Sequence, residues 1–484
     1  MRRQVTHGAA HTGAAQALRL LTQIGSALVL SRLLSPADFG LVAMAWPILA
    51  FANLFSDLGL SQAVVQKSSI TREEINTLFW INLAVSGGLA LILALLGPLV
   101  GIFYRDERTG FLTSAMSLTT LASGFGAQPG AILNRRMEFG FLAIIDAAGA
   151  IAGLSISVAW ALIAPSYWAL YAGALVSALV QTLGSWLAAG WAPSRPRLAA
   201  GWRELLNFGA GLTGFNVANF FARNFDNVLI GRFLGTVALG LYDRAYKLLL
   251  FPLQQINNPL SRVMYPALSR LVADPGRYRS AYLRTLGQLL LVALPGVAFM
   301  TATADDLIPV LLGEKWRAAG PIFGALGFAG LLQPLNNTSG WLFISQGRTS
   351  EFMRWGILGA VTSVIAFTMG LPYGPFGVAA AYAASEYFRT PLLWWYVARR
   401  GPIGVYDVMR TALPHLAGVA ASLLGLWVTP KFPISSPIFG LVSALLMSYA
   451  ISLLVILSFP AGRETITRSV SLAGGLWRRL RMEG

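Results

Sequence analysis

The chain has 484 residues, of which 55% are hydrophobic and only 12% are charged, and its mean hydropathy is +0.62. A soluble domain carries roughly 25% charged residues, so the composition argues against a soluble fold and predicts many membrane spans. The chain has no cysteine, which excludes disulfides and thiolate metal sites. The net charge is +16, but basic residues lie scattered between apolar segments, so we expect no nucleic-acid partner.

Apolar segments long enough to cross a bilayer, about 20 residues each, follow one another along the chain. Before a polar linker rich in Pro and Arg, we expect spans at residues 8–32, 38–62, 75–99, 111–132, 140–164 and 166–190. After it we expect spans at 206–232, 237–265, 281–303, 318–345, 352–370, 376–398, 409–428 and 435–459. The sequence therefore predicts an all-α integral membrane protein with about fourteen transmembrane helices.

An internal repeat relates the two halves of this array. Residues 31–41 read SRLLSPADFGL and residues 231–241 read GRFLGTVALGL, so Arg, Leu, Gly and Leu recur in register. Each copy joins two apolar segments, and repeats of this kind are common in transporters. The predicted domains are an N-terminal six-helix lobe (1–190), a cytoplasmic linker (191–205), a C-terminal six-helix lobe (206–398), an extra helix pair (399–459) and a basic amphipathic tail (460–484).

Basic residues concentrate in alternate loops. Arg135, Arg136, Arg203 and Arg279 lie in the basic set, whereas the other loops carry few Arg or Lys. The positive-inside rule makes the basic set cytoplasmic. Both termini are then predicted to be cytoplasmic, as an even number of spans requires.

Three stretches carry a family resemblance. Residues 31–40, 57–63 (DLGLSQA) and 226–235 (DNVLIGRFLG) resemble sequences of Wzx-type polysaccharide flippases. The match is closest to the exopolysaccharide and colanic-acid exporter type of the multidrug/oligosaccharidyl-lipid/polysaccharide exporter superfamily. The resemblance implies two six-helix lobes around a central cavity, with an extra helix pair at the C-terminal end.

The resemblance also implies an activity, which is flipping of undecaprenyl-pyrophosphate-linked oligosaccharide across the bacterial inner membrane by alternating access. The implied partners are that lipid-linked oligosaccharide, membrane lipids, a polysaccharide polymerase and glycosyltransferases. We expect no enzymatic activity, no cofactor and no metal. A G-x-G-x-x-G pattern at 209–214 begins an apolar span rather than following a strand, so it does not predict a dinucleotide site.

Ionisable residues inside spans are costly and usually face protein or a watered cavity. The basic residues on spans one, seven and eight, and two asparagines on the polar stripe of span seven, are candidates for binding the substrate: Arg19, Asn216, Asn219, Arg223, Arg244 and Lys247. Arginine donates bidentate hydrogen bonds to phosphate oxygens. The competing interpretation is internal pairing, as between Arg223 and Asp226, or snorkelling of Arg244 and Lys247 to the interface.

Acidic residues inside spans suggest other roles. Asp57, Asp146 and Asp226 are candidates for binding a coupling ion, although Asp57 and Asp146 could also meet interfacial water. Glu386 and Arg389 are three residues apart on one span, which favours a structural ion pair.

Two alternative functions compete with the flippase hypothesis. A drug or cation exporter of the same superfamily would have acids dominating its cavity, whereas spans one, seven and eight carry basic residues. A membrane-bound polymerase or ligase would need a catalytic constellation, for which Asp305 and Asp306 are the available paired carboxylates. In so short a loop, these two residues are better explained as surface charge.

The predicted topology can be tested with reporter fusions. Fusions after Arg136, Arg203 and Arg279 should report a cytoplasmic location, and fusions after Arg108 and Lys315 a periplasmic one, because basic loops stay inside. Inverted reports at two or more sites would contradict the fourteen-span topology.

Overall fold

The structure is a computed structural model that describes residues 18, 20–56, 64, 70–196, 202–428, 436–469 and 471, with side chains described outside 53–56 and 202–223. The described residues form helices and short connections, and they divide into two compact units, Met1–Gly240 and Leu241–Gly484.

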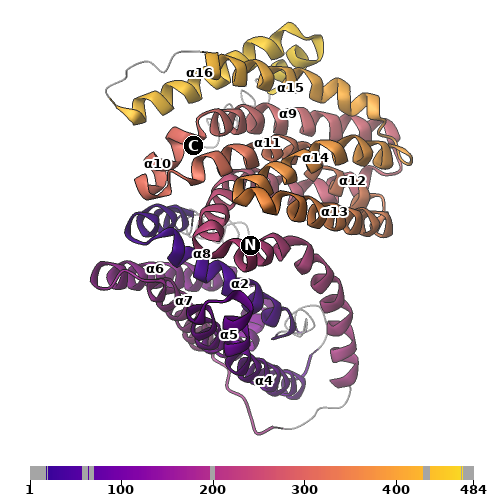
Figure 1. Ribbon diagram of the computed structural model, residues 1–484. Helices are drawn as coiled ribbons and strands as arrows, with labels where there is room; N and C mark the ends of the chain where they lie inside the picture. Colours follow the sequence, from indigo (N-terminus) through magenta and orange to yellow (C-terminus); the bar gives the residue numbers. More distant parts are fainter. Residues whose placement is uncertain are drawn as a thin grey trace, which may run out of the picture. The chain divides into compact units, whose positions relative to one another are not determined.

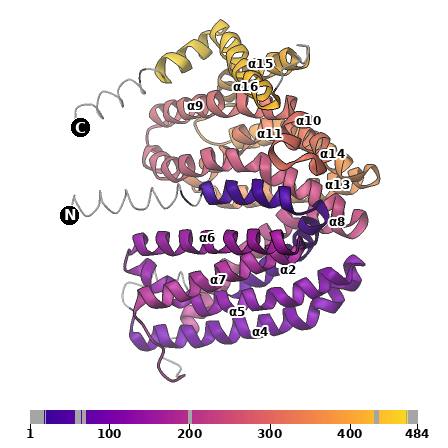
Figure 2. The same ribbon diagram turned by 90° about the vertical axis from the view of Figure 1, so that its left-hand side faces the viewer.

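The first unit is a bundle of long helices (Figures 1 and 2). It contains a helix over Leu20–Leu33, followed by α2 (Pro36–Ser56), α4 (Arg72–Tyr104), α5 (Glu107–Arg135), α6 (Phe139–Ile163), α7 (Tyr167–Ala189) and the first part of α8 (Trp202–Leu271). Helix α5 packs against both α4 and α7, and α6 packs against α7. Figure 2 shows α4, α5, α6 and α7 side by side.

Small residues bring these helices into close contact. A Cβ at Gly97 of α4 would lie 2.7 Å from the carbonyl oxygen of Gly110 on α5. A Cβ at Gly153 of α6 would lie 2.7 Å from the carbonyl oxygen of Gly173 on α7. Lipid hydrocarbon is as apolar as the surface of a membrane helix. Association of such helices therefore depends on close packing rather than on burial of apolar surface.

Local hydrogen bonds define the helix ends of this unit. Thr71 and Glu74 form a capping box at the start of α4. The Asp106 side chain caps α5 and also accepts two hydrogen bonds from the Arg108 guanidinium. This contact with Arg108 lowers the pKa of the Asp106 carboxyl. Side chains therefore satisfy backbone N–H groups that a helix start leaves unpaired.

Two arginines of predicted cytoplasmic loops donate hydrogen bonds to backbone carbonyl groups. The guanidinium of Arg135 donates to Val64 O (2.6 Å) and that of Arg136 donates to Ala189 O (2.9 Å), at the end of α7. Cations are favourable at helix C-termini, where carbonyl groups lack partners and the helix dipole is negative.

Among its described residues, the second unit contains the rest of α8, a helical stretch over residues 460–469 and, between them, eight α-helices (Figure 1). They are α9 (Pro275–Ala302), α10 (Ala304–Leu312), α11 (Ala319–Asn337), α12 (Ser339–Ser345), α13 (Thr349–Gly370), α14 (Gly374–Ala398), α15 (Val405–Val428) and α16 (Pro437–Ser458). Helix α11 packs against α9 and α14, and α14 packs against α13.

The extra helix pair α15–α16 docks on α9 through hydroxyl groups, of which those of Ser422 and Ser448 are buried. The Ser448 hydroxyl on α16 donates to Pro295 O of α9 at 2.7 Å and lies 2.7 Å from the Ser422 hydroxyl of α15. The Tyr449 hydroxyl donates to Val292 O of α9. Hydrogen bonds between membrane helices contribute on average about 0.6 kcal/mol each, so several together hold the pair on this unit.

The predicted fold class is confirmed, with differences at two places. Seven helices of the described residues are long and apolar enough to cross a membrane, α13 and α14 being merged in that count. Predicted spans seven and eight form one continuous helix, α8, interrupted only by the non-helical backbone of Gly235. The predicted span 318–345 is divided at Thr338 into α11 and α12. Hydropathy does not detect either feature, because both depend on backbone geometry within apolar sequence.

Candidate functional site

Several of the predicted site residues cannot be placed. Arg19 and Asp57 lie outside the described residues. Asn216, Asn219 and Arg223 lie on α8, but their side chains are also outside the described part. The roles predicted for these residues stay predictions.

The basic residues of the second part of α8 are placed by the structure. The Lys247 ammonium forms an ion pair with Asp243, one turn earlier on α8, at 2.9 Å. The Asp243 side chain is buried, whereas that of Lys247 is 57% exposed. The Nε atom of Arg244 is buried, so the inner part of this guanidinium is not exposed at the surface. The structure thus keeps three charged groups together on one helix.

The two acidic candidates within the described part differ in environment. Asp226 is buried on α8, and its Oδ1 accepts a hydrogen bond of 2.8 Å from the backbone N–H of Asn227. Asp146 on α6 is half-buried. A coupling-ion role for either residue stays a prediction.

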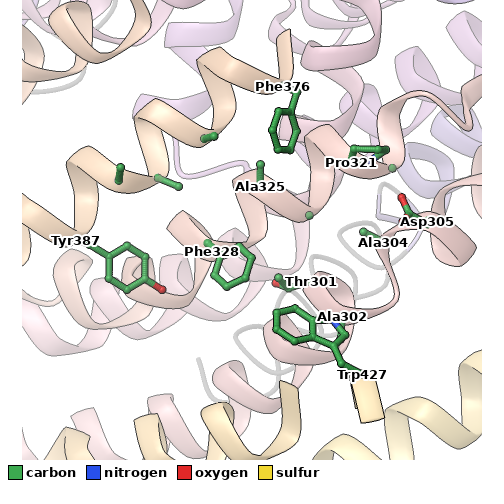
Figure 3. A pocket seen from close by; sticks show the side chains of 15 residues that line it. Thr301, Ala302, Ala304, Asp305, Pro321, Ala325, Phe328, Phe376, Tyr387 and Trp427 are labelled. Carbon is green, nitrogen blue, oxygen red and sulfur yellow. The ribbon is translucent and has the colours of Figure 1, made fainter. Parts of the chain in front are cut away.

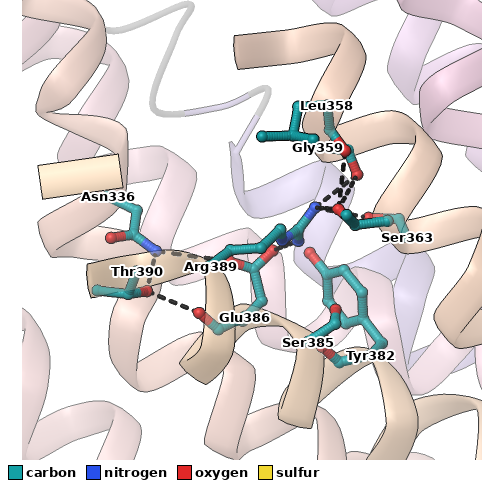
Figure 4. A network of polar contacts seen from close by, with 10 residues as sticks. Asn336, Leu358, Gly359, Ser363, Tyr382, Ser385, Glu386, Arg389 and Thr390 are labelled. Atoms are coloured by element: carbon teal, nitrogen blue, oxygen red, sulfur yellow. Dashed lines mark hydrogen bonds and ion pairs between the residues drawn. The ribbon is translucent and has the colours of Figure 1, made fainter. Parts of the chain in front are cut away.

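A polar network lies in the second unit, on α11, α13 and α14 (Figure 4). The predicted ion pair between Glu386 and Arg389 of α14 is present, and both side chains are largely buried. The same guanidinium crosses to α13, where its Nη1 donates to Gly359 O at 2.5 Å and to the hydroxyls of Thr362 and Ser363 at 3.1 and 3.0 Å. Arg389 therefore links α13 to α14 and compensates the charge of the Glu386 carboxylate.

The network continues to α11 through an amide. The Asn336 side-chain NH₂ donates to the Thr390 hydroxyl at 2.8 Å and to Glu386 at 3.4 Å. The Thr390 hydroxyl donates to the backbone oxygen of Glu386. Every helix of this trio thus contributes a polar group to one buried cluster.

A second buried arginine lies at the predicted cytoplasmic end of the unit. Arg348, between α12 and α13, donates from its guanidinium to Glu351 and to the carbonyl oxygens of Val397 and Arg400. Its side chain is only 9% exposed. It caps the end of α14 as Arg136 caps α7, so burial of this charge has a structural explanation.

A cavity of about 460 Å³ opens in the same unit, between α9, α10, α11, α14 and the end of α15 (Figure 3). The aromatic rings of Phe328, Phe376, Tyr387 and Trp427 surround it, together with small Ala and Gly residues, and Asp305 lies at its edge. A lining of this kind suits a hydrocarbon chain better than a charged head group.

The sequence analysis did not identify Asn336, Thr362, Ser363 or the cavity aromatics. Polar residues inside spans could have signalled the first three, because such residues need partners in hydrocarbon. Their partners could not have been named, since spacing along one helix says nothing about which helix lies opposite. Among the described residues, no group of three or more His, Asp or Glu side chains is arranged to hold a metal ion.

These observations define a class of protein: a helical membrane protein with many spans, built on an internal repeat, with ionisable groups inside its spans. A family model described as polysaccharide biosynthesis protein matches residues 29–321. The chain belongs to this family, and its predicted resemblance to Wzx-type flippases is confirmed.

Curated relatives agree with this assignment. The chain is 25% identical to the lipopolysaccharide biosynthesis protein WzxC of Escherichia coli over 77% of this chain and 76% of that protein. It is 27% identical to the teichuronic acid biosynthesis protein TuaB of Bacillus subtilis, over 73% and 74% of the two chains. It is 29% identical to the succinoglycan biosynthesis transport protein ExoT of Rhizobium meliloti, over 71% and 69%.

Solved structures with the same fold are also transporters. The inward closed conformation of the lipid II flippase MurJ has 13% identity and a TM-score of 0.73, with coverage of 92% of this chain and 97% of that chain. An inward-facing MATE family multidrug transporter has 14% identity and a TM-score of 0.61, with 84% and 96% coverage. At these identities the comparison establishes the fold only.

The Glu386–Arg389 network makes a testable prediction about stability. Arg389→Met should reduce stability by about 3–5 kcal/mol, because it leaves a buried carboxylate uncompensated. The double variant Glu386→Gln/Arg389→Met should be more stable than Arg389→Met alone. Thermal unfolding of the purified protein in detergent measures both effects.

The control is Arg468→Met, which removes the partner of Glu464 from an exposed pair also formed within one helix turn. Such a pair contributes about 0–1 kcal/mol. If Arg389→Met lowered the unfolding temperature no more than Arg468→Met, the network would not stabilise the second unit.

Proposed function

We propose that this protein flips a polyprenyl-pyrophosphate-linked oligosaccharide across the bacterial inner membrane, as a step in the synthesis of a surface polysaccharide. The observation that carries the proposal is the family match over residues 29–321, together with relatives named for lipopolysaccharide, teichuronic acid and succinoglycan synthesis or transport. The fold supports it, because two related halves suit a carrier with alternating access.

The proposed substrate has a pyrophosphate that must leave water, so the protein must supply positive charge along its path. Arg19 is the strongest candidate, because it lies within a predicted span and has no acid three or four residues away on either side. Arg223, Asn216 and Asn219 complete this proposed site on span seven. Arg244 would contribute charge from span eight, whereas the ammonium of Lys247, the other candidate there, is paired with Asp243. The polyprenyl tail would stay among apolar surfaces.

The deciding experiment measures the lipid-linked oligosaccharide itself. Deletion of the gene should make the oligosaccharide accumulate on the inner leaflet and should abolish the surface polysaccharide, and the intact chain should restore both. An unchanged lipid-linked pool in the deletion strain would contradict the proposed function.

Arg19→Ala tests the proposed binding role. We expect polysaccharide export to be lost while membrane abundance stays normal, because the fixed positive charge for the pyrophosphate is removed. Arg19→Lys should restore export only in part, since an ammonium keeps the charge but loses the bidentate geometry. Export and abundance are measured together.

The matched control is Arg277→Ala, which removes an arginine whose side chain is 78% exposed. This variant should export normally. Normal export by Arg19→Ala would refute the phosphate-binding role, and a parallel fall in abundance and export would make Arg19 structural.

A double substitution tests the competing enzyme hypothesis. Asp305 and Asp306 lie in the first turn of α10, and both residues are exposed. Asp305→Asn/Asp306→Asn should leave polysaccharide export intact, because we assign these residues to the surface. Loss of export at normal protein abundance would instead support acid–base chemistry by this pair.

A further inference from the structure

The two copies of the repeated motif form equivalent structures by different means. In the first copy, α2 begins at Pro36, and Ser35 and Asp38 cap it: Asp38 accepts from the Ser35 N–H and hydroxyl, and Ser35 accepts from the Asp38 N–H. In the second copy, α8 is interrupted at Gly235, whose φ of 83° and ψ of −176° suit glycine. In both copies, regular helical backbone is thus interrupted just before a helical segment begins, at Pro36 in the first copy and at Thr236 in the second.

The two copies contact each other reciprocally. Both lie in the first unit, where Gly40 of α2 touches the backbone of Thr236 and Gly240 of α8 touches the backbone of Pro36. In the repeat, Gly40 corresponds to Gly240 and Pro36 corresponds to Thr236. Each glycine therefore contacts, in the other copy, the residue four positions before the equivalent glycine. We name this contact the glycine crossing.

The glycine crossing has no room for a side chain. A Cβ at Gly40 would lie 2.6 Å from the carbonyl carbon and 3.0 Å from the Cα of Thr236. A Cβ at Gly240 would lie 2.8 Å from the carbonyl carbon of Pro36 and 3.0 Å from the Gly40 nitrogen. Carbon atoms in ordinary contact are about 3.5–4.0 Å apart, and the obstructing atoms belong to backbone, which cannot rotate away.

Large apolar side chains bury the residues on either side of the crossing. Leu34, Phe39 and Leu41 of the first copy are at most 2% exposed, and Leu239 of the second is fully buried. A third glycine, Gly231, allows Tyr104 and Met44 to approach: a Cβ there would lie 2.9 and 3.1 Å from their side chains. The crossing is therefore a buried contact whose closest atoms belong to backbone.

We propose that the glycine crossing is the closing contact of the predicted outer ends of the two halves, and that it parts and re-forms in each transport cycle. This proposal rests on the proposed function, since a carrier with alternating access must separate its related halves at one face. The closest atoms at the crossing belong to backbone, so one added methyl group is enough to favour the parted state.

The reciprocity makes a specific prediction about two substitutions. A single methyl at either glycine should keep both helix ends apart, so Gly40→Ala and Gly240→Ala should each shift the population towards the parted state. Once one methyl has opened the crossing, the other meets no obstacle. The double variant should therefore resemble each single variant, whereas two independent sites would give additive effects.

The experiment uses the absence of cysteine from the chain. A single reporter, Ser31→Cys, is introduced at the first residue of the first copy, where the natural side chain is fully buried. A membrane-impermeant maleimide is applied to spheroplasts, and the labelling rate is measured beside export and membrane abundance. The matched controls are Gly88→Ala and Gly130→Ala, helical positions where a Cβ meets nothing within 4 Å.

We expect Gly40→Ala and Gly240→Ala each to raise the labelling rate roughly tenfold and to reduce export to a similar degree, as a shift between two populated states would. The double variant should match the singles, and the controls should match the parent. Unchanged labelling in the well-folded single variants would overturn the proposal, as would additive effects in the double variant.

A second measurement covers the case in which the alanine variants fail to insert. The reporter in the otherwise unaltered chain should be labelled in cells that make the oligosaccharide, because the crossing parts during transport. Complete protection would overturn the proposal. Failure of the proposed function is distinguishable, because it would leave the lipid-linked pool unchanged in the deletion strain while the labelling contrast between variants and controls persisted.

Discussion

The lack of water inside the bilayer is the constraint on which the rest of this structure depends. An ionised side chain in the hydrocarbon core has no solvent to compensate its charge, so it must find partners within the protein. Arg389 meets this requirement with four acceptors from two helices, namely Glu386 on its own helix and three oxygens on α13. A single charge thereby determines which helix faces α14 and in which register, because a guanidinium with several fixed acceptors tolerates little displacement.

The same constraint determines how helices approach one another. Lipid tails are as apolar as leucine, so burial of apolar surface gives no net drive to join helices in a membrane. Contacts between backbones replace it, and they require glycine where two helices meet. Gly97 against Gly110 and Gly153 against Gly173 serve this purpose within the bundle of the first unit. At the glycine crossing the same chemistry joins the two copies of the repeat.

Sequence alone predicted the helical membrane class, because hydropathy reports directly on the bilayer, but it did not predict that spans seven and eight form one helix or that the span 318–345 is divided. It also predicted the Glu386–Arg389 pair, because both residues lie on one helix and their spacing suffices. It could not predict that Arg389 reaches Gly359 or that Arg136 caps Ala189, since those contacts join segments far apart in the chain. It identified the repeat, but the mutual contact of the copies appears only in three dimensions.

A distinction between structural and functional cations follows from these contacts. Lys247 and Arg389 each pair with an acid within one turn of the same helix, and each charge is thereby neutralised where it lies. Arg348 pairs with Glu351, three residues later, and donates hydrogen bonds to carbonyl groups at a helix end. A cation paired with an acid in this way attracts a phosphate less strongly, because the acid cancels much of its field. The sequence around Arg19 offers it no such acid. An arginine of that kind needs a partner on another helix, water or an anionic ligand. Pairing with an acid within one helix turn therefore marks cations that stabilise this fold, and Arg19, which has no such acid in the sequence, is the arginine to test for transport chemistry.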